Sequence, residues 1–395
     1  MFKCISCGKE LKNPLITLKN APANAQHMPG KDELIKDSGI DLPLYKCSGC
    51  GLCQLGTEPV FYYKDVIRAG GGSSTMKNLR RSQYSRLIET CGLAGKRILE
   101  AGCGKGEFLN VLCEFPVKAY GIEHDEELVK AARANGLNVW KDFADHPVKA
   151  PGEEEPFDAF LSFNFLEHQP DPVKMLKALF DSIKPGGYGL ITVPALSYIV
   201  ERGTYYELIR DHIAYYSKGS LRKLLTGCGF IVLYEETVNR DTLSVTVQRP
   251  LPGGAPEASA QGIPAEEAPD EDRALIEKSL NEGRRVTEGS VDALIKECGK
   301  IAVWGASHQG FTLISTTALK DAVPFIVDSA PFKQGKYAPA SHIPIVSPEE
   351  FFSSPCSAVL IAAPGYTEEI AGIIRQKAGD GIRIFTIRTR EIEEL

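Results

Sequence analysis

Two pairs of cysteines near the N-terminus have the spacing of a metal site. Cys4 and Cys7 form one Cys-x2-Cys pair, and Cys47 and Cys50 form a second. Two intervening residues allow both thiolates of a pair to reach one ion at about 2.3 Å, and two pairs complete a tetrahedron. Cys53 lies close enough in sequence to compete as a ligand, but only Cys47 and Cys50 repeat the spacing of the first pair. We therefore predict a closed, structural Zn2+ site that leaves no position for a substrate.

A glycine-rich turn follows a short apolar run in the segment 97–109. Glu100 is followed by Gly102, Gly104 and Gly106 at two-residue spacing, and then by an amphipathic stretch. Glycines in such a turn allow the backbone to pass close beneath a ligand and to adopt unusual torsions. The pattern alone is weak evidence, because dinucleotide-binding folds use similar turns.

The next predicted strand ends in Glu123, an acid placed to accept hydrogen bonds from both hydroxyls of a ribose. The pattern E-A-G-C-G-K-G followed by G-I-E closely resembles the class I S-adenosylmethionine (SAM)-dependent methyltransferases. A dinucleotide site would usually show G-x-G-x-x-G, with a helix N-terminus meeting the pyrophosphate. The resemblance implies a Rossmann-like domain whose SAM-binding residues include Glu100, Gly102, Gly104, Gly106 and Glu123.

Later segments continue this resemblance. Asp142 stands where the family places an acid that binds the adenine amino group, and Phe143 follows it as an apolar neighbour for the ring. Asn164 begins a loop that the resemblance places beneath the methionine portion of the cofactor. In this family the Glu167-His168 pair more often caps the next helix and lines the cofactor pocket than acts in catalysis.

An aromatic segment containing one acid–histidine pair follows the fifth predicted strand. A histidine near pKa 6.5 is suited to removing a proton from a hydroxyl, an amine or a carbon acid, and methyl transfer otherwise depends mainly on positioning. We predict that His212 is the catalytic base and that Asp211 assists it; the alternative is a buried histidine that holds a lid shut. The predicted substrate contacts in this segment are Tyr205, Tyr206 and Tyr215.

Taken whole, the chain resembles the C-methyltransferases that act on nucleotide-linked 4-keto deoxysugars. The resemblance implies an N-terminal zinc lobe, a class I middle domain and a C-terminal Rossmann-like domain. The segments that match are the two cysteine pairs with 47–55, 72–76, 211–217, 304–307, 327–328, 333–335 and 342–345.

The chain departs from this family where the chemistry is decided. Asp211-His212 replaces a Glu-His pair, and two positions usually held by tyrosine carry Arg68 and Ile209. Tyrosine hydroxyls at these positions would contact a keto sugar or its enolate. Methylation of oxygen or nitrogen on the same frame therefore stays an alternative to methylation of carbon.

The elements that position these residues fall into three blocks. Apolar runs alternate with amphipathic stretches over 77–250, which is the βαβ pattern of a doubly wound sheet. Residues 1–76 predict the zinc-binding lobe, and 251–270, rich in Pro, Ala, Gly and acids, predict a linker. Residues 271–395 predict a helix and then a second βα series whose last strand spans 382–387. We predict an α/β fold with an N-terminal zinc-binding lobe, a central Rossmann-like class I methyltransferase domain and a C-terminal Rossmann-like domain.

The C-terminal block begins with a strand, a glycine turn and a helix start over 301–310. Such a helix N-terminus could bind an anion, but the missing middle glycine of G-x-G-x-x-G argues against NAD. The resemblance suggests that this domain helps to enclose the nucleotide of the acceptor, with Ser307, His308 and Lys333 as predicted diphosphate contacts. The alternative is that these three are solvated loop residues.

Composition narrows the partners. The 395 residues carry a net charge of −6, which argues against a sequence-independent grip on nucleic acid. No run approaches the ~18 apolar residues of a membrane span, and the N-terminus has no apolar export segment, so we expect a cytoplasmic protein with reduced thiols. We predict a SAM-dependent methyltransferase of a small molecule, most simply a nucleotide-linked sugar. The alternatives are a nucleic-acid methyltransferase that uses the zinc lobe, and a non-catalytic binding or assembly protein.

Overall fold

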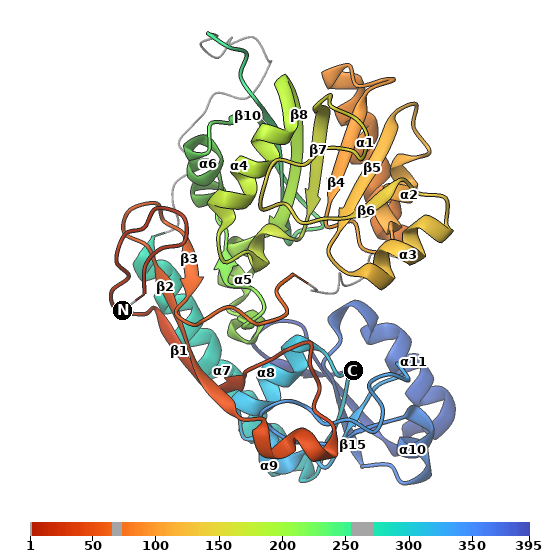
Figure 1. Ribbon diagram of the computed structural model, residues 1–395. Helices are drawn as coiled ribbons and strands as arrows, with labels where there is room; N and C mark the ends of the chain where they lie inside the picture. The colour runs from red at the N-terminus through yellow and green to blue at the C-terminus, as the bar shows by residue number, and fades with distance from the viewer. Residues whose placement is uncertain (1, 65–72, 254–271) are drawn as a thin grey trace.

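The computed structural model describes residues 2–64, 73–253 and 272–395, and it contains three β-sheets (Figure 1). Arg68, Gly72 and nearly all of the predicted linker 251–270 lie outside the described residues. None of the eleven cysteines forms a disulfide. Within the described ranges, no helix is long and apolar enough to cross a membrane.

The N-terminal sheet has four short antiparallel strands. Three come from the first part of the chain: β1 (Ile16–Pro22), β2 (Gly39–Lys46) and β3 (Cys53–Leu55), with the 3-10 helix η1 (Lys31–Lys36) between β1 and β2. The fourth is β9 (Ala214–Tyr215), in which Tyr215 pairs with Cys53 and Ala214 pairs with Gln54. The lobe is therefore completed by a strand from the predicted middle domain.

The central sheet has seven strands, and its parallel part carries the predicted cofactor residues. In spatial order the strands are β10 (Ile231–Val238), β11 (Thr242–Gln248), β8 (Ile183–Pro194), β7 (Phe157–Phe163), β4 (Arg97–Ala101), β5 (Lys118–Glu123) and β6 (Val139–Lys141). The pairs from β8 to β6 are parallel, whereas β10 and β11 are antiparallel. All five residues of β4 are buried, as expected for a parallel strand covered on both faces.

Helices cover both faces of this sheet. One face carries α1 (Ser74–Cys91), α2 (Glu107–Leu112) and α3 (Glu126–Ala134), which share one apolar cluster with the sheet. The other face carries α4 (Pro172–Ser182) and α6 (Lys218–Gly227), which belong to a second cluster. The chain order reverses between β4 and β7, and ligands bind in doubly wound sheets at the carboxyl ends of the strands at such a reversal.

The C-terminal sheet repeats this architecture with six strands. In spatial order they are β14 (Ile345–Val346), β13 (Ile326–Val327), β12 (Ala302–Trp304), β15 (Ala358–Ile361), β16 (Arg383–Ile387) and β17 (Ile392–Glu394). Its helices are α7 (Arg273–Cys298), α8 (His308–Thr316), α9 (Leu319–Ala322), α10 (Pro348–Ser353) and α11 (Thr367–Ala378). The prediction that 382–387 is the last strand was wrong, because β17 turns back antiparallel to β16.

The three parts share one apolar core where they meet. A single buried cluster joins Leu18 and Leu42 of the lobe to Phe311 of α8 and to the segment that follows β8. That segment contains α5 (Leu196–Arg202) and the 3-10 helix η3 (Tyr205–Glu207). In Figure 1 this segment lies between the central and C-terminal domains. The segment that carries the predicted acceptor residues is thus part of the junction between domains.

Two glycines allow α5 and α7 to approach closely. Gly203 ends α5 with a φ of 65°, and a Cβ atom added at Gly283 of α7 would collide with the Gly203 carbonyl. Gly289 lies in the same helix, but a Cβ atom there would meet nothing within 4 Å. The two glycines of α7 therefore differ only in their surroundings.

We expect Gly283→Ala and Gly289→Ala to change stability in opposite directions. In an open helical position, alanine stabilises by up to about 1 kcal/mol relative to glycine. At Gly283 that gain is outweighed by a clash with backbone that cannot rotate away, for which overpacking costs typically about 1–3 kcal/mol. Urea denaturation of both variants measures the difference, and equal midpoints would contradict the close contact between α5 and α7.

Candidate functional site

The four predicted zinc ligands lie together at one end of the lobe. Cys4 Sγ is 3.5 Å from Cys50 Sγ, and Cys7 Sγ is 3.5 Å from Cys47 Sγ. All four sulfur atoms lie within 4.8 Å of one another. This agrees with a tetrahedral Zn2+ site, in which the sulfur atoms are about 3.8 Å apart. Cys53 is buried on β3 outside this group. The donor set and its spacing fit the predicted ion.

The three predicted glycines form the turn between β4 and α2. Gly102, Gly104 and Gly106 have φ values of 69°, 60° and 85°, a left-handed region that residues with a side chain rarely adopt. The amide of Gly104 donates a hydrogen bond of 2.9 Å to Glu123 Oε2 at the end of β5. The glycine turn and the predicted ribose ligand thus lie side by side.

Glu123 is held by the backbone around it. Its other carboxylate oxygen, Oε1, accepts hydrogen bonds from the amides of His124 at 2.7 Å and Asp125 at 3.1 Å. The side chain is almost completely buried. Glu100 is fully buried on the neighbouring strand β4. Both acids therefore lie at or near the sheet reversal at which a ligand is expected.

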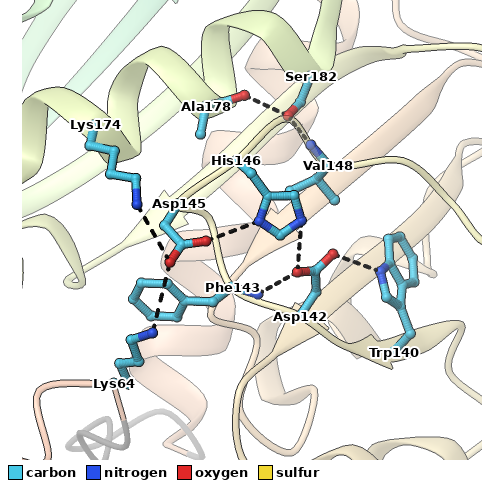
Figure 2. Close-up of polar contacts among 10 residues, drawn as sticks. All are labelled: Lys64, Trp140, Asp142, Phe143, Asp145, His146, Val148, Lys174, Ala178 and Ser182. Atoms are coloured by element: carbon cyan, nitrogen blue, oxygen red, sulfur yellow. Dashed lines mark hydrogen bonds and ion pairs between the residues drawn. The ribbon is translucent and has the colours of Figure 1, made fainter.

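Asp142 belongs to a polar network beside the predicted adenine position (Figure 2). Its carboxylate accepts a hydrogen bond of 2.7 Å from the amide of Phe143 and one of 3.4 Å from Trp140 Nε1. His146 Nε2 lies 3.3 Å from the same carboxylate. The contact of Asp142 with adenine stays a prediction, and it would have to share the carboxylate with these groups.

The cofactor position is closed by three side chains. A cavity of only about 10 Å³ remains among Gly102, Glu123, Phe143, Phe165 and Lys64. The Lys64 ammonium lies 4.4 Å from the centre of the Phe143 ring, and the Phe143 and Phe165 rings are 5.8 Å apart. An adenosyl group is far larger than this cavity, so binding of SAM at the predicted position would require Lys64 and the two phenyl rings to move.

Asn164 and His168 begin and end the loop after β7. Asn164 has a φ of 48°, which asparagine tolerates better than most residues, and its Oδ1 accepts a hydrogen bond from Thr192 Oγ1 at 3.0 Å. His168 is buried in the 3-10 helix η2 (Leu166–His168). The contact of Asn164 with the cofactor stays a prediction.

The two histidines His168 and His212 face each other. Their ring centres are 4.7 Å apart at an angle of 75°. His168 Nδ1 lies 2.7 Å from the Asp211 carbonyl oxygen, so Nδ1 carries the proton and Nε2 does not. Burial lowers the pKa of His168 to about 4 and places the pKa of His212 well below its usual value. Both imidazoles are therefore neutral at physiological pH, as a general base must be.

Asp211 turns its side chain away from His212 and toward the lobe. Its Oδ2 accepts a hydrogen bond of 3.1 Å from the amide of Ala25. Burial raises the pKa of Asp211, while the charge of His308 and the hydroxyl of Tyr62 lower it. The predicted assistance of Asp211 to His212 therefore stays a prediction, and it would have to act through the backbone because the Asp211 side chain binds the lobe.

The three predicted substrate tyrosines have hydroxyls that contact the protein. Tyr205 Oη lies 3.3 Å from Thr316 Oγ1, and Tyr206 donates to the Thr389 carbonyl at 2.5 Å. Tyr215 Oη accepts from the amide of Ile209 at 2.7 Å and donates to the Ile209 carbonyl at 3.1 Å. All three rings are buried in the junction between domains, and of the three only Tyr206 lines the cleft described below.

The three residues predicted to bind a diphosphate do not lie in one anion site. Ser307 caps its own helix by accepting from the amide of Gly310 at 3.0 Å. The Lys333 ammonium is bonded to Asp328 at 3.0 Å and to the Ala306 carbonyl at 2.9 Å. His308 instead interacts electrostatically with Asp211 and with His168 and His212. The diphosphate contacts stay predictions, and His308 belongs with the histidine pair.

A cleft of about 280 Å³ opens between the central and C-terminal domains. It lies at the carboxyl ends of β12 and β15, where the order of the C-terminal sheet reverses. Burial raises the pKa of Glu207 to about 7, and it also raises the pKa of Asp241. The polar and aromatic side chains that line the cleft are Tyr198, Tyr206, Glu207, Asp241, Gln309 and Arg388.

Sequence reasoning missed several residues of this site. Lys64 carries no motif, Tyr62 lies in an aromatic run, and Glu207 is one acid within an aromatic segment. His168 was noticed only as a pocket residue. Each becomes a candidate only when separate elements are brought together, so no local signal could have found them.

The comparisons with known proteins agree with this architecture. A methyltransferase domain model matches residues 76–235, and a C-methyltransferase C-terminal domain model matches residues 276–387. The C-methyltransferase NovU of Streptomyces niveus is 22% identical over 389 residues, which cover 93% of this chain and 91% of that protein.

Other relatives match a smaller share of the chain. The ubiquinone biosynthesis O-methyltransferase of Bordetella bronchiseptica is 36% identical over 105 residues, which cover 25% of this chain and 44% of that protein. The chain therefore spans less than half the length of that relative. The crystal structure of magnesium protoporphyrin IX methyltransferase from Synechocystis with bound S-adenosylhomocysteine covers 47% of this chain, with 15% identity and a TM-score of 0.36.

The glycine turn, Glu123 at the sheet reversal, the neutral histidine pair and the two domain matches point to one class of enzyme. The chain carries a methyltransferase domain over residues 76–235, which indicates a SAM-dependent methyltransferase, and in its order of domains it resembles the C-methyltransferases.

Proposed function

We propose that the chain transfers a methyl group from SAM to a carbon atom of a nucleotide-linked sugar. The observation that carries this proposal is the pair of neutral imidazoles of the buried His168 and the half-buried His212 at the junction between domains. The near full-length similarity to NovU, which is named a C-methyltransferase, supports the choice of carbon.

The cofactor residues would act by holding SAM at the reversal of the central sheet. Gly102 and Gly104 would let the backbone pass close to the ligand. The turn has little space for larger residues, because a Cβ atom at either glycine would approach Phe165 or Glu107 at 3.0–3.4 Å. Glu123 would accept hydrogen bonds from the ribose hydroxyls, and Asp142 and Phe143 would contact the adenine. Bound SAM supplies an electrophilic methyl group.

The base chemistry would belong to His212. A carbon atom next to a carbonyl group becomes nucleophilic when it loses a proton, and the neutral imidazole of His212 would accept that proton. His168 would position His212 through the contact between the two rings and through its own hydrogen bond to the Asp211 carbonyl. The buried surroundings exclude water, which strengthens both interactions.

The C-terminal domain would enclose the acceptor. The cleft lined by Tyr206, Glu207 and Gln309 offers aromatic surface and hydrogen-bonding groups close to the segment that carries His212. Its two carboxylates disfavour a phosphate within the cleft itself, so the diphosphate would lie outside it, and Ser307, His308 and Lys333 stay the predicted contacts. A single Zn2+ held by the four cysteines would stabilise the lobe.

Loss of the Glu123 carboxylate is expected to weaken SAM binding. Glu123→Ala removes an acceptor that serves both ribose hydroxyls, and hydrogen bonds to a charged group contribute about 1.5–3 kcal/mol each. We expect the dissociation constant for SAM, measured by calorimetry, to rise at least about 10-fold. Glu127→Ala, on the exposed face of α3, is the matched control, and equal affinities would remove Glu123 from the cofactor site.

The proposal is tested by supplying SAM and a panel of nucleoside diphosphate sugars, some with a 4-keto group and some fully hydroxylated. Release of S-adenosylhomocysteine is measured together with the mass of each sugar. A methyl group gained by a keto sugar at a carbon position, located by NMR, supports the proposal. Methylation only of hydroxyl or amino groups would assign oxygen or nitrogen as the target. Binding of SAM without turnover on any sugar would exclude this acceptor class.

A further inference from the structure

The N-terminal lobe forms hydrogen bonds with the chain on both sides of His212. Arg210 Nη1 donates to the Ala23 carbonyl at 2.8 Å, and Arg210 Nη2 donates to the Glu58 carbonyl at 3.2 Å. On the other side, the amide of Leu55 donates to the Ile213 carbonyl at 3.0 Å. The position of the proposed base is therefore set by the lobe as well as by the domain to which it belongs.

The side chain of Asp211 is buried against two segments of the lobe. Only 1% of this residue is exposed, and Oδ2 accepts the hydrogen bond from Ala25. The other oxygen, Oδ1, is buried and has no hydrogen-bond partner of ordinary length in 2–64, 73–253 and 272–395. A buried carboxylate oxygen in this situation requires a nearby donor or a ligand.

The hydroxyl of Tyr62 lies beside this carboxylate, because the adjacent residues Ala25 and Gln26 donate their amides to Asp211 Oδ2 and to Tyr62 Oη. The amide of Gln26 donates to Tyr62 Oη at 3.4 Å, so the hydroxyl oxygen is used as an acceptor and its own proton is left to donate. The Tyr62 proton is thus available to the Asp211 carboxylate, whose Oδ1 has no partner among the described residues.

We propose that Tyr62 is a positioning residue of the active site, which directs its hydroxyl proton to the Asp211 carboxylate and so anchors to the lobe the segment that carries His212. The inference deepens the proposed function and rests on it. Tyr62 would place a phenol beside Asp211 in a chain that carries Arg68 and Ile209 where the resembled family usually has tyrosine; Arg68 lies outside the described residues.

The electrostatics around Asp211 support this role. Burial favours the neutral acid and raises its pKa, whereas His308 from α8, Tyr62 and the Ala25 amide favour the charged form. Tyr215 of β9 also faces Asp211, and the charge of Asp211 raises the pKa of that phenol. Burial and the same charge raise the pKa of Tyr62, so its hydroxyl stays protonated and remains a donor at physiological pH.

The consequence reaches both histidines through the backbone. The Asp211 carbonyl accepts the hydrogen bond from His168 Nδ1, and His212 is the next residue in the chain. A neutral Asp211 carboxyl would no longer need the hydrogen bond from Tyr62. The segment that carries Asp211 and His212 would then lose one of its contacts with the lobe. Tyr62 therefore acts on the reaction through Asp211 and not by touching the acceptor.

The test compares Tyr62→Phe with Tyr45→Phe in the full-length, zinc-containing protein. Tyr45 lies in the same lobe on β2, away from Asp211. With SAM and a nucleoside diphosphate 4-keto-6-deoxysugar, we expect kcat for Tyr62→Phe to fall about 10-fold and the affinity for SAM to stay unchanged. We also expect the acidic limb of the kcat profile to move upward by about one pH unit, because loss of the donor raises the Asp211 pKa.

A second readout does not depend on the acceptor. Carbon-13 NMR of the protein labelled at its aspartate carboxyls gives the Asp211 titration, assigned by the signal missing in Asp211→Asn. A higher Asp211 pKa in Tyr62→Phe than in Tyr45→Phe supports the inference even if no sugar of the panel is methylated. An unchanged Asp211 titration overturns it, whatever the activity.

A double variant separates positioning from simple loss of stability. If Tyr62 acts through Asp211, Tyr62→Phe combined with Asp211→Asn is no slower than Asp211→Asn alone. Effects that multiply would show that Tyr62 contributes independently of Asp211, which contradicts the inference.

Discussion

Replacement of His212 by alanine is expected to lower the rate of methyl transfer by about 100- to 10,000-fold, the range for loss of a general base. The affinity for SAM should stay unchanged, because the predicted cofactor residues lie at the ends of β4 and β5, whereas His212 lies in the segment after β8. Single-turnover kinetics with a keto sugar, together with calorimetry of SAM binding, measure both quantities.

The pH dependence gives the same prediction a second test. Burial and the neighbouring His168 and His308 lower the pKa of His212 from 6.5, so the imidazole stays neutral and competent as pH falls through 6.5. The part of the acidic limb that belongs to His212 should therefore lie below pH 6.5. His27→Ala, on an exposed part of the lobe, is the control. Full activity of His212→Ala would assign the base to another residue.

Replacement of Cys47 by serine is expected to remove the zinc ion and to lower the melting temperature by roughly 10 °C or more. Cys47 is buried at the turn that leads into β3, and structural zinc contributes about 10–16 kcal/mol of apparent binding free energy in small domains. Zinc content by mass spectrometry and melting by calorimetry check the two effects.

Two other cysteines serve as controls for the metal site. Cys113→Ser changes an exposed thiol, so we expect one zinc per chain and an unchanged melting temperature. Cys53→Ser places a hydroxyl in the buried core of β3, so stability should fall while the zinc content stays at one per chain. Loss of zinc in Cys53→Ser would mean that Cys53 is a ligand.

Much of the fold could be predicted from local patterns. The buried strands β4, β5 and β7 are short apolar runs with clear boundaries, and α7 follows directly from the helical pattern after the predicted linker. The contribution of β9 to the lobe could not be predicted. Two residues carry no periodicity of their own, and their partner strand lies far away in the sequence.

Parts of the candidate site could be predicted where the functional residues lie close together in the sequence. The four cysteines and the turn from Gly102 to Gly106 are of this kind, because spacing alone fixes what they can do. The aromatic segment was harder to interpret. Tyr205 and Tyr206 have the composition of a substrate lid, but aromatic rings that pack a domain junction have the same composition.

The charged neighbours of single residues could not be predicted from the sequence. Lys333 has the side chain of a phosphate ligand, and in the fold it forms an ion pair with Asp328. His308 interacts electrostatically with Asp211, and the diphosphate contacts of both residues stay predictions. Such neighbours come from tertiary structure and leave no trace in the spacing of the sequence.

The strand β9 has a consequence for the synthesis of the protein. β3 leaves the ribosome about 160 residues before its partner, which at ~5–20 residues per second corresponds to roughly 10–30 s. During this time β3 presents an unpaired edge next to a cluster of reduced thiols, and such an edge can pair with another chain. If the nascent lobe binds zinc early, the thiols are no longer available to other metals or thiols. The yield of folded protein in cells should therefore depend on the zinc supply during translation more than on the zinc supply afterwards.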